Sequence, residues 1–232
     1  MIKNNDLKTS PKQRIIITII AIFMLGSTFA LYAGIVLNAS NPTTSGSTVT
    51  IEEEDRYNEL MEEYQAKVDK QAQELSAKYF DKFVKYKNRV KSFNQADISE
   101  VKKVDLKDGT GKKVTDSDFT EYSAYYVGWL KDGTVFDSSF DDFKNPSALK
   151  TPLAGNANMI EGWKQGIVGM KIGGVREISI PSALAYGDQD NGNIPANSSL
   201  KFIIMLIDPV EEVEVPEELE KLWYKINYGT EM

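Results

Sequence analysis

The stretch from Tyr122 to Ser139 constrains the fold more than any other part of this 232-residue chain. Two runs of aromatic and β-branched residues are separated there by Lys131-Asp-Gly-Thr134. An Asp-Gly pair between two such runs is a strong signal for a β-hairpin. Strand alternation divides the first run into two sets: Tyr122, Ala124, Tyr126 and Gly128 on one face, and Tyr125, Val127 and Trp129 on the other. The stretch therefore predicts an antiparallel pair with aromatic residues on both faces.

Further strands are predicted around this hairpin. The runs 175–180 and 200–207 are rich in β-branched residues, and 101–106 suits a first strand ended by Asp108-Gly-Thr-Gly111. One short helix is predicted by apolar residues at helical spacing, which are Met159, Ile160, Trp163, Ile167 and Met170. Many strands with a single short helix predict an α+β domain built on an antiparallel sheet.

Composition excludes several kinds of chemistry. The chain has no cysteine and no histidine. Disulfides, thiolate or imidazole zinc sites, Cys or His nucleophiles and Ser-His-Asp arrangements are therefore impossible. The formal charge of -7 argues against nucleic-acid binding, which needs a basic face. We expect neither a metal nor a cofactor.

The N-terminal region predicts a membrane anchor. Residues 1–14 form a basic tail, and residues 15–37 carry no charge. An uncharged run of this length can cross a bilayer of about 30 Å. A buried core helix and a cleaved signal peptide, with a small-residue site near Ala30, are the alternatives, but signal h-regions are typically shorter. Positive charge before the span places the N-terminus in the cytoplasm. We expect a single-pass protein of the cell membrane whose C-terminal domain is extracytoplasmic.

Two amphipathic helices are predicted outside the sheet domain. A polar linker over 38–50 leads to Thr50-x-x-Glu53, which has the form of a capping box. Residues 51–95 then carry apolar side chains with a period of about 3.6. This helix either lies along its own domain or is an arm for homodimerisation. The tail 211–232 predicts a second amphipathic helix, with Leu219, Leu222, Trp223 and Ile226 on one face.

Three motifs resemble a known family. The hairpin, the Met159–Met170 stretch and Ile180-Pro-Ser-Ala-Leu-Ala-Tyr-Gly187 together resemble the FKBP-type peptidyl-prolyl cis-trans isomerases, the immunophilins that bind FK506-like macrolides. The resemblance runs from about 101 to 209, within a domain assigned to 97–210. It implies an antiparallel sheet wrapped on a short helix, proline-containing polypeptide substrates and an FK506-like ligand.

The resemblance also names the site residues. It implies catalytic roles for Tyr126, Phe136, Asp137, Trp163, Tyr186 and Phe202, and substrate binding by Met159, Ile160 and Ile194. The backbone amide at Ile160 and the Tyr186 hydroxyl would contact the bound carbonyl. From the residues alone, composition favours a core role for Tyr126, Phe136, Trp163 and Phe202, whereas an acid at 137 is not expected in a core. Lys150, Thr151 and Pro152 stand where the family carries aromatic residues, and Phe140 or Phe143 would refill that wall.

These residues suit prolyl isomerisation, because it needs no nucleophile. The barrier to amide rotation is about 18–20 kcal/mol. An apolar aromatic site that grips the proline ring and strips water from the carbonyl favours the twisted amide. We therefore expect an extracytoplasmic isomerase acting on X-Pro bonds of exported proteins. The alternative is a non-catalytic chaperone or binding module of the same fold.

Overall fold

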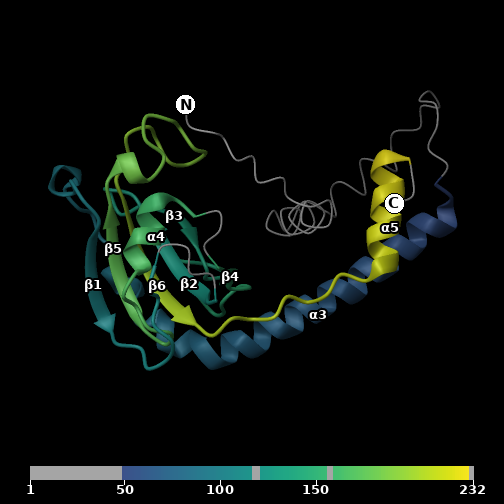
Figure 1. The fold of residues 1–232 in the computed structure, drawn as a ribbon. Helices are drawn as coiled ribbons and strands as arrows, with labels where there is room; N and C mark the ends of the chain where they lie inside the picture. Colours follow the sequence, from purple (N-terminus) through teal and green to yellow (C-terminus); the bar gives the residue numbers. More distant parts are fainter. Residues whose placement is uncertain (1–48, 117–120, 156–158, 230–232) are drawn as a thin grey trace. The chain divides into compact units, whose positions relative to one another are not determined.

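The computed structural model describes residues 49–116, 121–155 and 159–229 (Figure 1). The predicted basic tail and the predicted span over 15–37 lie outside these residues. Within the described ranges, no helix combines the length and the apolar character that membrane crossing requires. The chain divides into two compact units, Met1–Ala66 with Val213–Met232, and Lys67–Glu212.

The larger unit is built on an antiparallel sheet with the strand order β1-β5-β6-β2-β3, and β4 pairs with β2. The strands are β1 (Lys102–Lys107), β2 (Ser123–Trp129), β3 (Val135–Ser138), β4 (Leu153–Ala154), β5 (Val175–Ile180) and β6 (Leu200–Ile207). Among the described residues of this unit, one α-helix lies between strands, namely α4 (Glu161–Ile167). This arrangement confirms the predicted α+β class and the predicted hairpin.

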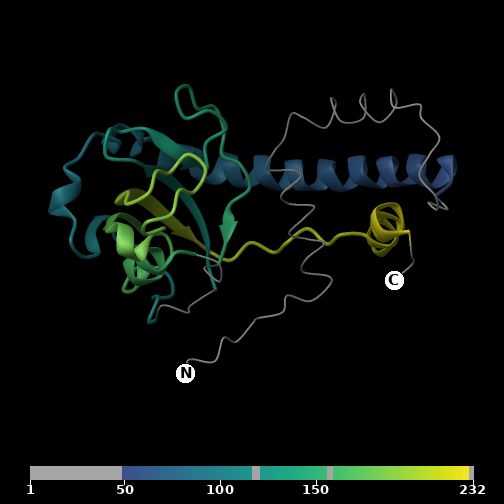
Figure 2. The same ribbon diagram turned by 90° about the horizontal axis from the view of Figure 1, so that it is seen from above.

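The two faces of the sheet carry separate hydrophobic clusters. Tyr122, Ala124 and Tyr126 belong to the cluster that includes Trp163 of α4. Tyr125, Val127 and Trp129 belong to the second cluster, together with the end of helix α3 (Ile51–Val84). Figures 1 and 2 show α4 and the last turns of α3 on opposite sides of the sheet. Alternate residues of β2 therefore belong to two different hydrophobic clusters, as the sequence predicted.

Helix α4 lies very close to the sheet. A Cβ atom at Gly166 would lie 2.8 Å from Cδ1 of Ile178 on β5. At the end of this helix, the buried side chain of Arg176 donates hydrogen bonds to the carbonyl oxygens of Gly166, at 2.8 Å, and of Val168, at 2.9 Å. A cation at this position complements the carbonyl groups that every helix leaves unpaired at its C-terminus.

The long helix is shorter than predicted, because α3 ends at Val84 rather than near residue 95. After Val84 the chain makes a short 3-10 helix over Lys87–Arg89 and then bonds to the hairpin. Nε1 of Trp129 donates to the carbonyl oxygen of Lys91 at 3.0 Å, and the Phe93 amide donates to the carbonyl oxygen of Lys131 at 2.8 Å. These contacts hold the chain in a non-helical path across the end of the hairpin. Apolar periodicity continues past Val84 because these residues still face the core.

The smaller unit contains the start of α3 and helix α5 (Glu217–Tyr228). The predicted capping box is present, since the Thr50 and Glu53 side chains each accept a hydrogen bond from the other's backbone amide. Ion pairs join the two helices, with Lys225 to Glu53 at 2.6 Å and Arg56 to Glu218 at 2.9 Å. Large apolar residues of both helices are buried, namely Leu60, Met61, Tyr64, Leu219 and Trp223.

Candidate active site

Four aromatic rings meet on the α4 side of the sheet. The Phe202 ring makes edge-to-face contacts with Trp163, at a centroid distance of 5.4 Å, and with Phe136, at 5.5 Å. Tyr126 packs edge-on against Trp163 at 5.6 Å. Trp163 and Phe202 are buried, whereas Tyr126 and Phe136 are half-buried. The cluster therefore has a closed aromatic floor and two partly exposed aromatic sides.

An irregularity in the β2–β3 ladder brings two consecutive residues of β3 to this cluster. Gly128 pairs with Asp137, but the next residue, Trp129, pairs with Val135. Phe136 is the extra residue of a β-bulge, and bulges re-aim side chains. In a regular strand Phe136 and Asp137 would point to opposite faces. The bulge lets the Phe136 ring contact Phe202 while the Asp137 carboxylate contacts Tyr126.

A glycine makes room for the rings. Gly128 lies between Asp137 on β3 and Phe202 on β6. A Cβ atom at this position would lie 2.6 Å from Cζ of Phe136 and 2.6 Å from Cε1 of Phe202. Both distances are shorter than any normal contact between carbon atoms. The edge-to-face packing of the two rings therefore requires glycine at 128.

The Tyr126 side chain is held at its hydroxyl and at its backbone. Its hydroxyl donates a hydrogen bond to Oδ2 of Asp137, and Oδ1 accepts from the Ser138 amide at 2.7 Å. The Tyr126 amide donates to Oγ of Ser139 at 2.9 Å. Burial, and then the hydrogen bond and charge of Asp137, raise the pKa of Tyr126 far above its ordinary value. The phenol therefore stays protonated and keeps donating to the carboxylate.

A second tyrosine fixes the aromatic floor. Nε1 of Trp163 donates to the hydroxyl oxygen of Tyr122 at 3.1 Å, and both side chains are fully buried. Tyr122 was predicted only to lie on one face of a strand. Its position on the same face as Tyr126 was the available signal. No residue pattern indicated that its hydroxyl would accept from the indole of Trp163.

The other predicted residues lie around the same cluster. Ile194 is buried in it, and Met159 and Ile160 pack against it from the start of α4. Tyr186 has 36% of its surface exposed and lies close enough to contribute to the raised pKa of Tyr126. The structure thus places all nine predicted residues in one region, while their individual roles stay predictions. In the described part of the chain, no three acidic side chains are grouped to hold a metal ion.

The expected refilling of the missing aromatic wall does not occur. Phe140 is fully buried in the cluster on the opposite face of the sheet, where it stacks on Phe83 at 5.4 Å. Phe143 packs against Phe140 and lies under the ammonium group of Lys87. Both rings are drawn to α3 and its C-terminal extension because these present a large apolar and aromatic surface. Neither ring joins the aromatic cluster of the site.

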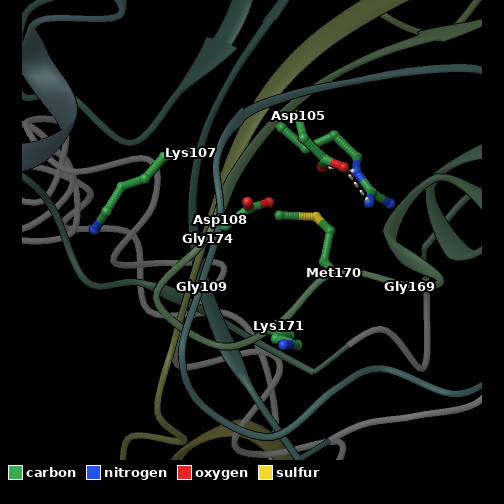
Figure 3. A pocket seen from close by; sticks show the side chains of 9 residues that line it. Asp105, Lys107, Asp108, Gly109, Gly169, Met170, Lys171 and Gly174 are labelled. Atoms are coloured by element: carbon green, nitrogen blue, oxygen red, sulfur yellow. Dashed lines mark hydrogen bonds and ion pairs between the residues drawn. The ribbon is translucent and has the colours of Figure 1, made fainter.

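A cavity of about 220 Å³ lies elsewhere in the larger unit (Figure 3). It is lined by polar and charged groups, and the Asp105 carboxylate points toward Arg176, whose Nε donates to it at 2.6 Å. None of the nine predicted residues lines this cavity. Its charged side chains largely neutralise one another, in contrast to the apolar lining of the aromatic site.

The fold and the site together define a class, and comparison with known proteins agrees. The family model described as FKBP-type peptidyl-prolyl cis-trans isomerase matches residues 111–207. An FK506-binding protein of Neisseria meningitidis serogroup A is 38% identical over 108 residues, which are 46% of this chain and 94% of that protein. The chain belongs to the FKBP-type peptidyl-prolyl cis-trans isomerases, which confirms the prediction of the enzyme class.

Two fungal relatives are longer than the matched region. FK506-binding protein 2 of Debaryomyces hansenii is 45% identical over 86 residues, 37% of this chain and 61% of its own length. FK506-binding protein 4 of Chaetomium thermophilum is 40% identical over 104 residues, 45% of this chain but only 20% of its own length. The structure of a peptidyl-prolyl cis-trans isomerase from Pseudomonas syringae pv. tomato has a TM-score of 0.40 and 28% identity, covering 49% of this chain and 78% of that one.

Proposed function

We propose that this protein accelerates cis-trans isomerisation of X-Pro bonds in exported polypeptides, at the aromatic cluster beside Asp137. The observation that carries the proposal is the cluster of four aromatic rings, one of which is the protonated Tyr126 that donates to Asp137. This arrangement offers an apolar seat for a proline ring. Beside that seat lie the Tyr126 hydroxyl and the Asp137 carboxylate.

The properties of the amide bond explain why such a site would accelerate isomerisation. Rotation about an X-Pro bond is slow, taking tens to hundreds of seconds, because conjugation is lost as the bond twists. Water bound to the carbonyl oxygen stabilises the planar, charge-separated form. A proline ring seated on Trp163 and Phe202 would bring its preceding carbonyl out of water, so the twisted amide becomes relatively more favourable. No covalent intermediate is required.

Two donors are proposed for the twisted carbonyl. The Ile160 amide lies at the start of α4, beside the aromatic floor. The Tyr186 hydroxyl lies on the exposed side of the site, near Tyr126. Hydrogen bonds that form only with the twisted amide would stabilise the transition state more than the substrate. The same site would accept an FK506-like macrolide, the ligand after which the FK506-binding relatives are named.

A protease-coupled assay on short X-Pro peptides tests the activity. The full chain should accelerate isomerisation, and FK506 should inhibit it. Phe136→Ala should abolish most turnover while the protein still unfolds cooperatively, because this ring is half-buried. A chain that binds FK506 but does not accelerate any peptide would instead be a binding module. Turnover and inhibition that both survive Phe136→Ala would show that the site is assigned incorrectly.

We further propose that the protein is anchored in the cell membrane by residues 15–37, with the isomerase outside the cytoplasm. The support is the uncharged run itself and the basic residues that precede it. Protease added to intact cells should digest the chain beyond residue 38 and leave a small membrane-bound fragment. A mature protein that begins near residue 31 would show a cleaved signal peptide instead.

Homodimerisation through residues 51–95 stays a prediction, with less support than the sequence alone suggested. It was based on an apolar stripe too long to be covered by one chain. In the structure, Leu60, Met61, Tyr64 and Phe83 of this stripe are buried. Light scattering of the full chain in detergent would detect a dimer directly.

A further inference from the structure

The segment that follows Asp137 is fastened to helix α3 on the opposite face of the sheet. The loop 140–149 is closed at its base, where Phe140 and Leu149 form a β-bridge and the Lys150 amide donates to the carbonyl oxygen of Ser139 at 2.8 Å. Asp141 accepts hydrogen bonds inside this loop from the amides of Ser147, at 3.0 Å, and Ala148, at 3.1 Å. The loop is therefore a defined structure and not a loose connection.

Three residues of α3 hold the base of this loop. Oγ of Ser76 accepts a hydrogen bond from the Leu149 amide at 2.9 Å, and both residues are buried. The Phe83 ring stacks on Phe140 with an angle of 21° between the planes. Phe80 meets the same ring edge-on at 6.2 Å. A hydroxyl group and two aromatic rings thus fix the loop base from one helix.

The base of the loop leads directly to the catalytic tyrosine. Ser139 exchanges two hydrogen bonds with Tyr126, because its amide donates to the Tyr126 carbonyl oxygen and its hydroxyl oxygen accepts from the Tyr126 amide, each at 2.9 Å. Two residues earlier, Asp137 accepts from the Tyr126 hydroxyl. The segment 137–139 therefore orients Tyr126 at both ends, and α3 fixes the position of that segment.

We infer that Ser76 and Phe83 of α3 are positioning residues of the isomerase site, acting through Phe140, Leu149 and Ser139 on the Tyr126–Asp137 pair. This inference rests on the proposed function, because it assigns the helix a role in the same reaction. The helix is then part of the catalytic unit as well as a cover for the sheet. Small displacements of a catalytic group from remote changes are known to cost large factors in rate.

The chain offers a matched pair of serines for the test. Ser123 is also buried, and its Oγ accepts a hydrogen bond from the Val210 amide at 3.0 Å. Both of these residues lie outside segment 137–150. Ser76→Ala and Ser123→Ala each remove one buried hydroxyl that accepts from a backbone amide. Their effects on thermal stability should therefore be similar, and any difference in catalysis reflects position.

The experiment measures kcat/KM on an X-Pro peptide and amide hydrogen exchange in the full chain. Ser76→Ala should lower kcat/KM by about tenfold and accelerate exchange at Tyr126 and Ser139, and Ser76→Thr, which keeps the hydroxyl, should restore both. Ser123→Ala should change neither. Equal activities for the two alanine variants, or unchanged exchange at Tyr126 and Ser139 in Ser76→Ala, would overturn the inference.

The test still gives an answer if the unmodified chain is inactive or if Ser76→Ala does not fold. If the unmodified chain isomerises no peptide, the proposed function fails, and hydrogen exchange still decides whether Ser76 positions segment 137–139. If Ser76→Ala does not fold, Phe83→Leu takes its place, because it removes the stack on Phe140 and retains an apolar side chain. The same two measurements then apply, with the same interpretation.

Discussion

The hydroxyl group of Tyr126 donates a hydrogen bond to the carboxylate of Asp137 across two neighbouring strands. Asp137 pairs directly with Gly128 and therefore faces the same side of the sheet as Tyr126, and the β-bulge at Phe136 brings the Phe136 ring to this side as well. Asp137 is exposed, whereas Tyr126 is half-buried among aromatic rings. The carboxylate therefore orients the phenol from the solvent side, and its own contact with substrate is not needed to explain its position.

This relationship predicts a non-additive pair of substitutions. Asp137→Asn and Tyr126→Phe should each lower kcat/KM by about tenfold or more, since a hydrogen bond to a charged group contributes roughly 1.5–3 kcal/mol. The double variant should be no slower than the slower single variant, because both changes remove one interaction. Multiplied losses in the double variant would show that Asp137 acts on the substrate independently.

Three tyrosines with raised pKa values should make the stability of the protein depend on pH. Burial raises the pKa of Tyr122 and Tyr125, and burial together with Asp137 raises that of Tyr126, each from an ordinary value of 10.0. Above pH 10 the unfolded chain loses phenolic protons that the folded chain keeps. The folded state should therefore keep its full stability below about pH 10 and lose it as the pH rises further. Urea unfolding between pH 8 and 11 measures this slope.

A comparison of two of these tyrosines separates burial from hydrogen bonding. Among the described residues, no partner accepts from or donates to the buried hydroxyl of Tyr125. Tyr125→Phe should therefore leave the free energy of unfolding unchanged or raise it by about 1 kcal/mol. Tyr122→Phe should lower it by about 1–3 kcal/mol, because Nε1 of Trp163 would lose its acceptor. A destabilised Tyr125→Phe variant would reveal a bound water at that hydroxyl.

The sequence predicted the sheet for a physical reason, whereas the resemblance to the family named the candidate site residues. Strands β5 and β6 are continuous apolar runs, and β2 alternates between two faces, so local pattern alone defines them. The site residues belong to motifs next to turns and to a short helix. Each motif therefore carries its residues into place once the hairpin and the sheet form.

Local sequence patterns do not predict contacts between segments that are distant in the chain. The apolar period of the long helix continues past Val84, yet the chain ends its α-helix there and, beyond a short 3-10 helix, bonds through Lys91 and Phe93 to the hairpin. Phe140 was expected beside the substrate and lies instead on Phe83. Both differences arise from the packing of α3 on the sheet. The apolar period of a helix indicates that one of its faces is buried but does not indicate against which surface.

Replacing Gly128 by alanine should disturb the aromatic cluster, whereas the same replacement at Gly166 should not. Gly128→Ala should displace the rings of Phe136 and Phe202, lower activity strongly and cost about 1–3 kcal/mol of stability from overpacking. Gly166→Ala is the control, because its new methyl group would meet the flexible end of Ile178 on the sheet and not the two rings. It should destabilise the protein with a smaller loss of kcat/KM. Equal activity losses at equal stability would argue against a special role for Gly128.

The last prediction concerns where the isomerase domain begins. By sequence motifs it begins near Asp97. In the structure, the end of α3 covers a cluster that includes Tyr125, Trp129 and Phe140. A chain of residues 97–212 would expose these side chains to water. Loss of a buried phenylalanine such as Phe83 alone costs about 3–5 kcal/mol, a large part of the roughly 5–15 kcal/mol that stabilises a typical domain.

We therefore expect residues 67–212 to fold and to isomerise a tetrapeptide, and residues 97–212 to be unstable or aggregated. Thermal unfolding and binding of a hydrophobic dye compare the two chains directly. Adding a peptide of residues 67–96 to the shorter chain should restore part of its stability, because the missing contacts come from that segment. If the two chains unfold at the same temperature with equal activity, α3 contributes neither stability nor position to the site, and the role assigned to Ser76 and Phe83 is lost with it.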